Sequence, residues 1–310
     1  MTDQQNNSVE VPPQVNRLVA LIAERNPTHA KHLDRVMPRI HADEYQHLET
    51  YLEYCLESGL ELSYLADCYL LLVADAVNEL AYFQREGNYR YSTFAEVADH
   101  VYFNKEYMDQ YMYGLAISLI FWSSHMEIHR YFEETLPLDK TGKYLEIGPG
   151  HGRFLMSAME RSSFNAFVGI DISETSIAQT RAVLSHFNPS PDADLSLVVQ
   201  DFHETELPAG SCDAVVMGEV LEHVEDPASF LSKIRELAAP EAHIFITTCV
   251  NAPQIDHIYL FRSLDEVRDL IESQGLAIVS EKAVPYEGKT LEQCAKHALP
   301  VNVAYVLKAV

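Results

Sequence analysis

A glycine-rich stretch near the middle of the chain restricts the fold more than any other feature of the sequence. In residues 144–154, Y-L-E-I-G-P-G-H-G-R-F, a short apolar run breaks into glycines at alternate positions, and apolar residues with helical spacing follow. This pattern predicts a strand, a tight turn and a helix. Because glycine has no Cβ, a ligand can lie against the bare backbone of Gly148, Gly150 and Gly152 at the N-terminus of the helix.

The spacing of these glycines argues against two common nucleotide sites. G-x-G-x-G differs from the G-x-G-x-x-G of dinucleotide-binding folds, and no Lys-Ser/Thr pair follows that could hold a triphosphate. The acid Glu146 precedes the turn within the predicted strand. An NAD-dependent oxidoreductase is therefore disfavoured.

The pattern of apolar residues changes near residue 140. Residues 11–139 are helical in pattern and predict an all-α N-terminal domain, with one long helix from Asn104 to about Thr135, and the polar residues 1–10 predict a disordered tail. Beyond this point strands and helices alternate, and strands are predicted at residues 143–147, 166–170, 195–199, 214–217, 243–247, 277–283 and 301–307. Residues 140–310 therefore predict an α/β domain with a Rossmann-like, seven-stranded, doubly wound sheet that ends in an antiparallel C-terminal hairpin.

Composition narrows the range of partners. The chain of 310 residues has a formal net charge of −24 and no basic stretch, so neither nucleic acid nor an anionic membrane is an expected partner. Its five cysteines are widely spaced and include no C-x-x-C pair, which favours free thiols in a reducing compartment. The polar N-terminus shows no signal peptide, and the apolar stretch at residues 65–83 contains three acids. We expect a cytoplasmic protein; a homodimer is compatible with the sequence, which does not define the oligomeric state.

Residues that suit an adenosyl ligand follow the predicted strands. In a doubly wound sheet, ligands lie outside the carboxyl ends of the strands, beside the first strand. The second strand ends at Asp171, whose carboxylate can accept hydrogen bonds from both ribose hydroxyls, and the third ends at Asp201-Phe202, which suit the amino group and the ring of adenine. A single such Asp is more often a turn former, but acids at three strand ends, Glu146 included, favour a ligand site.

These residues resemble the ordered motifs of the class I S-adenosyl-L-methionine (SAM) methyltransferases. The run G-E-V-L-E-H-V-E-D-P from Gly218 is closest to the branch that methylates quinone precursors and other small molecules, and the resemblance covers about residues 140–310. It implies SAM as the cofactor. The implied contacts are Glu146, Gly148, Gly150 and Gly152 at the methionine end, Asp171 and Ile172 at the ribose, Asp201 and Phe202 at the adenine, and Gly218 and Glu219 near the sulfonium. Pro149 and His151 depart from the usual pattern, and the role of His151 stays open.

Two histidines are candidate catalytic residues. His223 follows the fourth strand, next to where the methyl group should project, and histidine titrates near neutral pH, which suits a general base. The alternative for His223 is a packing or capping role. The resemblance implies that the segment after the fifth strand reaches over the methyl acceptor, and this segment contains His257, with Asp256 able to orient its ring, and Tyr259.

The helical domain is expected to cover the acceptor as a lid. Tyr107 and Tyr111 share one helical face and His125 and His129 share another, which fits either an aromatic lid over the sulfonium or ordinary helix packing. Glu127 lies on a different face from the two histidines, so no metal site is expected there or elsewhere.

The sequence thus predicts a SAM-dependent methyltransferase that acts on a C, N or O nucleophile of a small molecule, in metabolite biosynthesis. Two alternatives keep the SAM site. The first is a SAM-utilising cyclase or an aminocarboxypropyl transferase, which would release methylthioadenosine. The second is a non-catalytic SAM-fold subunit, against which the intact motifs argue.

Overall fold

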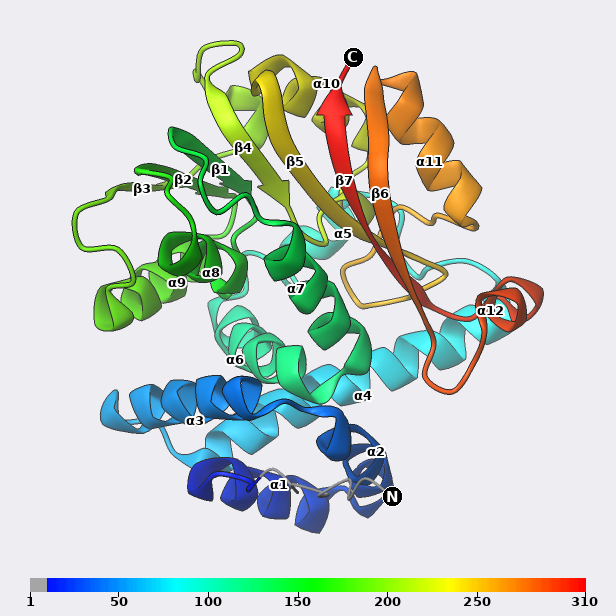
Figure 1. Cartoon of the computed structure of the whole chain (residues 1–310). Coiled ribbons are helices and arrows are strands. Elements are labelled where there is room, and N and C mark those ends of the chain that lie inside the picture. Colours follow the sequence, from blue (N-terminus) through cyan, green and yellow to red (C-terminus); the bar gives the residue numbers. More distant parts are fainter. Residues whose placement is uncertain (1–9) are drawn as a thin grey trace, which may run out of the picture.

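The computed structural model describes residues 10–310, so the predicted tail lies almost entirely outside the described residues. A layer of helices forms the N-terminal part, and a sheet flanked by helices forms the C-terminal part (Figure 1). The N-terminal helices are α1 (Pro13–Arg25), α2 (Pro27–Val36), α3 (Ala42–Glu57), α4 (Leu62–Glu86), α5 (Phe94–Ala98), α6 (Lys105–Phe121) and α7 (Ser123–Thr135), with a 3-10 turn, η1 (Met37–Arg39), after α2.

The sheet has seven strands in the order β3-β2-β1-β4-β5-β7-β6. The strands are β1 (Lys143–Ile147), β2 (Ala166–Asp171), β3 (Asp194–Val199), β4 (Cys212–Met217), β5 (Ala238–Val250), β6 (Leu276–Pro285) and β7 (Val301–Ala309). Strands β1 to β5 pair in parallel, whereas β7 pairs antiparallel with both β5 and β6. The predicted seven-stranded doubly wound sheet and its antiparallel C-terminal hairpin are confirmed.

Helices cover both faces of the sheet because neighbouring residues of each strand point to opposite sides. Tyr144, Phe167 and Phe245 face the core that contains α7, α8 (Arg153–Arg161) and α9 (Glu174–Phe187). Leu145 and Ile244 face the other core, beneath α10 (Pro227–Leu237) and α11 (Leu264–Ser273). Two 3-10 turns, η2 (Phe202–Glu204) and η3 (Leu221–His223), follow β3 and β4.

The long helix predicted from residue 104 to 135 is in fact two helices. Trp122 has an extended backbone, with φ −110° and ψ 118°, and separates α6 from α7. Its indole N–H donates to the Tyr69 hydroxyl at 3.2 Å, which fixes the break against α4. The change of direction lets α7 pack on β6 and β7, so this helix lies on the sheet (Figure 1). The domain division near residue 140 stays a prediction, and we propose that it lies closer to Trp122.

The connection between β6 and β7 extends beyond the sheet toward the N-terminal helices (Figure 1). It contains α12 (Leu291–His297), which the sequence analysis did not anticipate. The side chains of His32 and Arg35 on α2 both bond to Glu287 of this connection, at 2.8 and 3.0 Å. Within residues 10–310, no helix is both long enough and apolar enough to cross a membrane.

Candidate active site

The glycine turn presents bare backbone where β1 ends. Gly148 and Gly150 have positive φ angles of +66° and +55°, which glycine adopts without strain. A Cβ on Gly148 would lie 2.8 Å from a methyl group of Val220, so a side chain there would force Val220 to move. At Gly150 the nearest atom to an added Cβ, apart from its chain neighbours, would be Met112 Cε at 3.6 Å, because this residue borders a cavity. The turn is followed by Gly152, the N-cap residue of α8.

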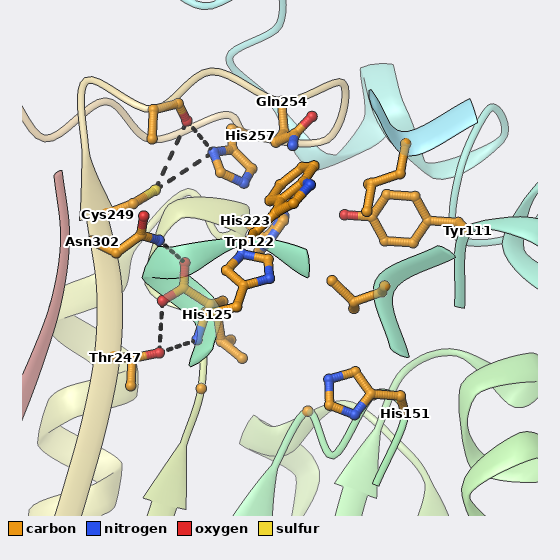
Figure 2. A pocket seen from close by; sticks show the side chains of 18 of the residues that line it. Tyr111, Trp122, His125, His151, His223, Thr247, Cys249, Gln254, His257 and Asn302 are labelled. Atoms are coloured by element: carbon orange, nitrogen blue, oxygen red, sulfur yellow. Dashed lines mark hydrogen bonds between the residues drawn. The ribbon is translucent and has the colours of Figure 1, made fainter. Parts of the chain in front are cut away.

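A cavity of about 840 Å³ lies at the carboxyl ends of the strands, and residues of α4, α6 and α7 also line it. Figure 2 shows part of its lining. Most of the residues predicted to contact the cofactor line the cavity. They are Gly148, Gly150, Asp171, Ile172, Asp201, Phe202, Gly218 and Glu219. Glu146 and Gly152 are not among its lining residues.

The acids that follow β2 and β3 keep acceptor capacity free for a ligand. Asp171 accepts from the Ser173 N–H at 2.8 Å and from the Ser176 hydroxyl at 2.9 Å, and burial raises the pKa of its carboxyl. Asp201 accepts from the His203 N–H at 2.8 Å and is otherwise exposed. Phe202 is buried beside Asp201 and provides an apolar surface. This set matches the needs of a ribose and an adenine ring.

Glu146 is buried below the turn. Its Oε2 accepts from the Tyr144 hydroxyl at 2.6 Å, and burial raises the pKa of its carboxyl to about 8. The side chain does not line the cavity. Its implied contact with the methionine end of the cofactor therefore stays a prediction.

Glu219 is held at the floor of the cavity by three bonds. Thr247 Oγ1 donates to its Oε1 at 2.7 Å, Asn302 Nδ2 donates to its Oε2 at 3.3 Å, and its own N–H donates to Thr247 Oγ1 at 2.9 Å (Figure 2). Its φ of +51° is unusual for a residue with a side chain. The unusual backbone and the partly buried carboxylate at the cavity indicate a functional position.

His223 lines the cavity and is oriented through its Nδ1 atom. This nitrogen lies 3.1 Å from the Asp256 carbonyl oxygen, 3.3 Å from Asp256 Oδ2 and 3.0 Å from the Tyr102 hydroxyl. A carbonyl oxygen can only accept, so Nδ1 carries the proton and Nε2 is the basic nitrogen of the neutral ring. Asp256 was expected to orient His257, but in the structure its carboxylate is bonded to His223.

His257 packs edge-on against His223, with 4.7 Å between the ring centroids. Its Nδ1 donates to the Ala252 carbonyl oxygen at 2.6 Å, so its Nε2 also lacks a proton in the neutral ring. Burial, together with the nearby His223, lowers the pKa of His257 well below its ordinary value. Both histidines thus offer a free imidazole nitrogen at the same end of the cavity.

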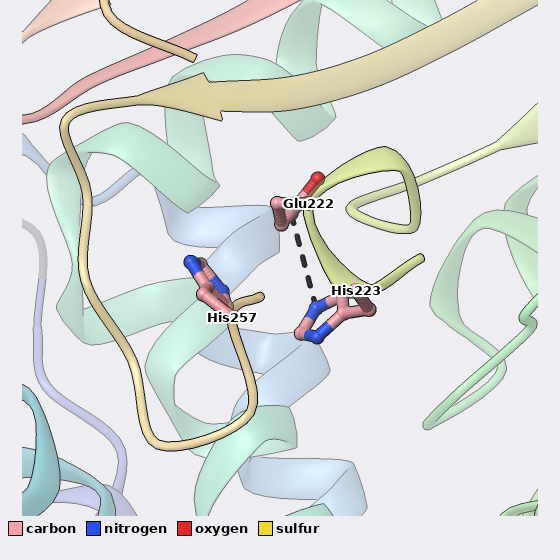
Figure 3. Close-up of side chains that lie close together, drawn as sticks. All are labelled: Glu222, His223 and His257. Carbon is pink, nitrogen blue, oxygen red and sulfur yellow. Dashed lines mark ion pairs between the residues drawn. The ribbon is translucent and has the colours of Figure 1, made fainter. Parts of the chain in front are cut away.

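A buried acid, Glu222, completes this corner (Figure 3). Its Oε2 accepts from Thr248 Oγ1 at 2.7 Å, whereas its Oε1 has no hydrogen-bond partner and lies 3.9 Å from His223 Nε2. One potential ligand atom from each of Glu222, His223 and His257 lies within 4.8 Å of the others, and a second such group consists of Glu219, Glu222 and Cys249. These are the residues that could hold a metal ion, so the expected absence of a metal stays a prediction.

The predicted lid residues separate into two groups. Tyr111 and His125 line the cavity, whereas Tyr107 and Tyr259 do not. The Tyr107 hydroxyl donates to Asp75 at 2.7 Å, and Tyr259 packs against Phe261 with ring centroids 4.7 Å apart.

Several cavity residues were not assigned a role from the sequence. They include Trp122, His151 and Gln254, all visible in Figure 2. His151 lies between two glycines of the turn, and this position in the sequence is a signal that could have identified it as a cavity residue. Burial lowers the pKa of His125 to about 4 and that of His151 to about 3, so both rings are neutral at neutral pH.

Comparison with known proteins agrees with this geometry. A family model described as a methyltransferase domain matches residues 123–298, which is more than half of the chain. The chain therefore belongs to the class I SAM-dependent methyltransferases, the family whose cofactor is SAM. The bare backbone at Gly150 and the carboxylates of Asp171 and Asp201 fit the adenosyl and methionine groups of that cofactor.

Two curated relatives carry the same name. Ubiquinone biosynthesis O-methyltransferase of Acinetobacter baumannii (strain AYE) is 29% identical over 157 residues, which are 47% of this chain and 63% of the relative. The protein of that name from Pseudomonas aeruginosa (strain UCBPP-PA14) is 34% identical over 119 residues, 38% of this chain and 48% of the relative. The chain thus spans less than two thirds of the relatives that it matches.

A solved structure shares the fold. Haemonchus contortus phosphoethanolamine N-methyltransferase 2, in complex with SAM, has a TM-score of 0.53 and 14% identity, and the likeness covers 71% of this chain and 60% of that chain. At this identity the likeness shows the fold alone.

Proposed function

We propose that the protein transfers a methyl group from SAM to an oxygen, nitrogen or carbon nucleophile of a small molecule. The observation that carries this proposal is the single cavity that joins two sets of residues. The residues predicted to contact the cofactor lie at the carboxyl ends of β1 to β4, and the candidate bases His223 and His257 lie in the segments that follow β4 and β5.

Bound SAM supplies a methyl group on a positively charged sulfur. Asp171 and Asp201 would hold the adenosine, and the glycine turn would receive the methionine end. His223 would accept the proton of the acceptor at Nε2, while the Asp256 carboxylate stabilises the resulting imidazolium. The N-terminal helices cover part of the cavity and would help to hold donor and acceptor in an in-line arrangement.

We further propose that the reaction belongs to small-molecule biosynthesis in the cytoplasm. The name of the two curated relatives supports a biosynthetic role. A reducing compartment is supported by the five cysteines, which are all buried free thiols.

Calorimetric titration with SAM tests the proposal directly. We expect a dissociation constant in the micromolar range, and no binding at millimolar SAM would overturn it. The coproduct of turnover separates the proposed reaction from the alternatives that keep the SAM site. Adenosylhomocysteine in the mass spectrum supports methyl transfer, whereas methylthioadenosine would support cyclisation or transfer of the aminocarboxypropyl arm.

A further inference from the structure

The cavity has an apolar wall that the cofactor site does not use. Five α4 side chains line it: Leu72, Val73, Ala76, Val77 and Leu80. We call these residues the α4 wall. Their spacing places them on one face of the helix. They come from the N-terminal part of the chain, whereas the residues predicted to hold SAM lie at the carboxyl ends of the strands. The α4 wall therefore belongs to the acceptor side of the cavity.

The α4 wall extends from the interior of the cavity to the surface of the protein. Leu72 and Val73 are buried, whereas Val77 is 61% exposed even though it lines the same cavity. Tyr286, on the connection between β6 and β7, also lines the cavity and is 42% exposed. The lining of the cavity therefore reaches the surface at Val77 and at Tyr286, so a ligand that lies along the α4 wall can extend to the surface there.

The charged side chains of the lining restrict which ligands can lie along the α4 wall. Among the described residues, Arg35 is the only Arg or Lys side chain that lines the cavity, and its guanidinium is paired with Glu287 at 3.0 Å. The other lining side chains with a formal charge at neutral pH are acids: Asp171, Asp201, Glu219, Glu225 and Glu287. A carboxylate or phosphate on the acceptor would find no free cation, and its desolvation would not be compensated.

From this arrangement we infer that the acceptor is an uncharged amphipathic molecule. Its nucleophilic head lies beside His223 and His257, and its apolar tail lies along the α4 wall and reaches the surface at Val77 and Tyr286. This inference rests on the proposed function, since it names the class of substrate for the same site. The volume of about 840 Å³ is within the range of a single ligand pocket. Donor and acceptor head together would therefore fill the interior, and a longer tail would extend to the surface.

The protein contains an intrinsic fluorescent probe for ligand binding on the acceptor side of the cavity. Trp122 is the only tryptophan in the chain and lines the cavity, so its fluorescence reports occupation of the acceptor side. Hexan-1-ol, octan-1-ol, decan-1-ol and decanoate serve as ligands, with SAM present at saturation. We expect the alcohols to change the emission with an affinity that rises about 4-fold per methylene group. Decanoate, equal in length to decanol but anionic, should bind at least 10-fold more weakly.

Matched variants on one helix locate the tail. Ala76→Glu places a charge in the α4 wall, whereas Ala74→Glu makes the same change on an exposed residue of α4 outside the lining. Ala76→Glu should weaken decanol binding at least 10-fold, and Ala74→Glu should leave it unchanged. Val77→Glu, at a position already exposed to solvent, should weaken decanol binding as well and guards against a folding defect in Ala76→Glu.

SAM titration of each variant separates the two proposals. If wild-type protein does not bind SAM, the proposed function fails, whatever the alcohols do. If SAM binds but decanol does not, the inference about the acceptor is overturned. It is also overturned if decanoate binds as tightly as decanol, or if Ala74→Glu and Ala76→Glu weaken decanol binding equally.

Discussion

The carboxylate of Asp171 makes hydrogen bonds within the protein and also borders the cavity. It accepts hydrogen bonds from Ser173 and Ser176 at the start of α9, and it lines the cavity. We expect Asp171→Ala to weaken SAM binding about 10- to 100-fold, because hydrogen bonds to a charged group contribute about 1.5–3 kcal/mol. Isothermal titration measures the effect. Ser176→Ala removes one internal bond but keeps the carboxylate, so it should change the affinity much less. Full affinity in Asp171→Ala would refute the ribose contact.

The two histidines differ in their partners, and their variants should differ as well. His223 is bonded to a carboxylate, whereas His257 Nδ1 is bonded to a backbone carbonyl. With any acceptor that the wild type methylates, we expect His223→Ala to lower kcat by about 100-fold or more, the usual range for loss of a general base. We expect a smaller loss for His257→Ala.

The pH profile provides the control for this assignment. A general base must be deprotonated before it can accept a proton, so wild-type kcat/KM should fall on the acidic side. This acidic limb should disappear in His223→Ala and persist in His257→Ala. If the limb is unchanged in His223→Ala, then His223 is not the base.

At the residue scale, the sequence predicted those site residues whose location is determined by a strand next to them in the chain. Asp171, Asp201 and His223 could be placed because each closely follows a strand, and the carboxyl ends of parallel strands meet at one edge. The partner of His223 could not be placed. Asp256 reaches it only because the loop after β5 folds back, where the N–H groups of Ile258 and Tyr259 both donate to the Glu222 carbonyl oxygen at 2.9 Å.

At the scale of elements, the glycine turn allows a matched comparison. Gly150 and Gly87 both have positive φ, +55° and +73°, but only Gly150 lines the cavity. Either glycine changed to alanine should lower the free energy of unfolding by about 1 kcal/mol, because the left-handed backbone is strained with a Cβ. Only Gly150→Ala should also weaken SAM binding. Thermal unfolding and calorimetry measure the two effects, and equal SAM affinity in both variants would contradict the role of the turn.

Helix boundaries were predictable where local signals were strong. The Thr93–Glu96 capping box opens α5, and Asp226-Pro227 opens α10. The break at Trp122 was not predictable, because no glycine or proline marks it and its cause is a contact with Tyr69 on another helix. By contrast, α12 carries a readable signal, the capping box of Thr290 and Gln293, which the sequence analysis did not use.

For the whole molecule, burial of Glu146 couples stability to pH. Burial raises the pKa of its carboxyl from 4.5 to about 8, so the folded protein holds this proton more tightly than the unfolded chain. Its contribution to stability is therefore complete below pH 4.5 and is lost as the pH rises toward 8. Glu146→Gln removes this proton. The free energy of unfolding of the variant, relative to that of the wild type, should therefore rise by up to about 1.4 kcal/mol per pH unit between pH 5 and pH 8.

Chemical denaturation across this range measures the difference. Glu160→Gln is a suitable control, because Glu160 belongs to the adjacent helix α8 and is exposed, with a smaller rise in the pKa of its carboxyl. If the free energies of unfolding of wild type and Glu146→Gln change with pH in the same way, Glu146 is not protonated in the folded state.

The position of β7 has a consequence for synthesis on the ribosome. This strand lies between β5 and β6 although it follows both in sequence. As the nascent chain emerges, one edge of β5 stays unpaired until residues 301–309 are available, and β6 cannot join the sheet before them. Unpaired edges of this kind promote aggregation. The slowest and most vulnerable stage of folding should therefore be the late insertion of β7, after the cofactor-binding strands have already assembled.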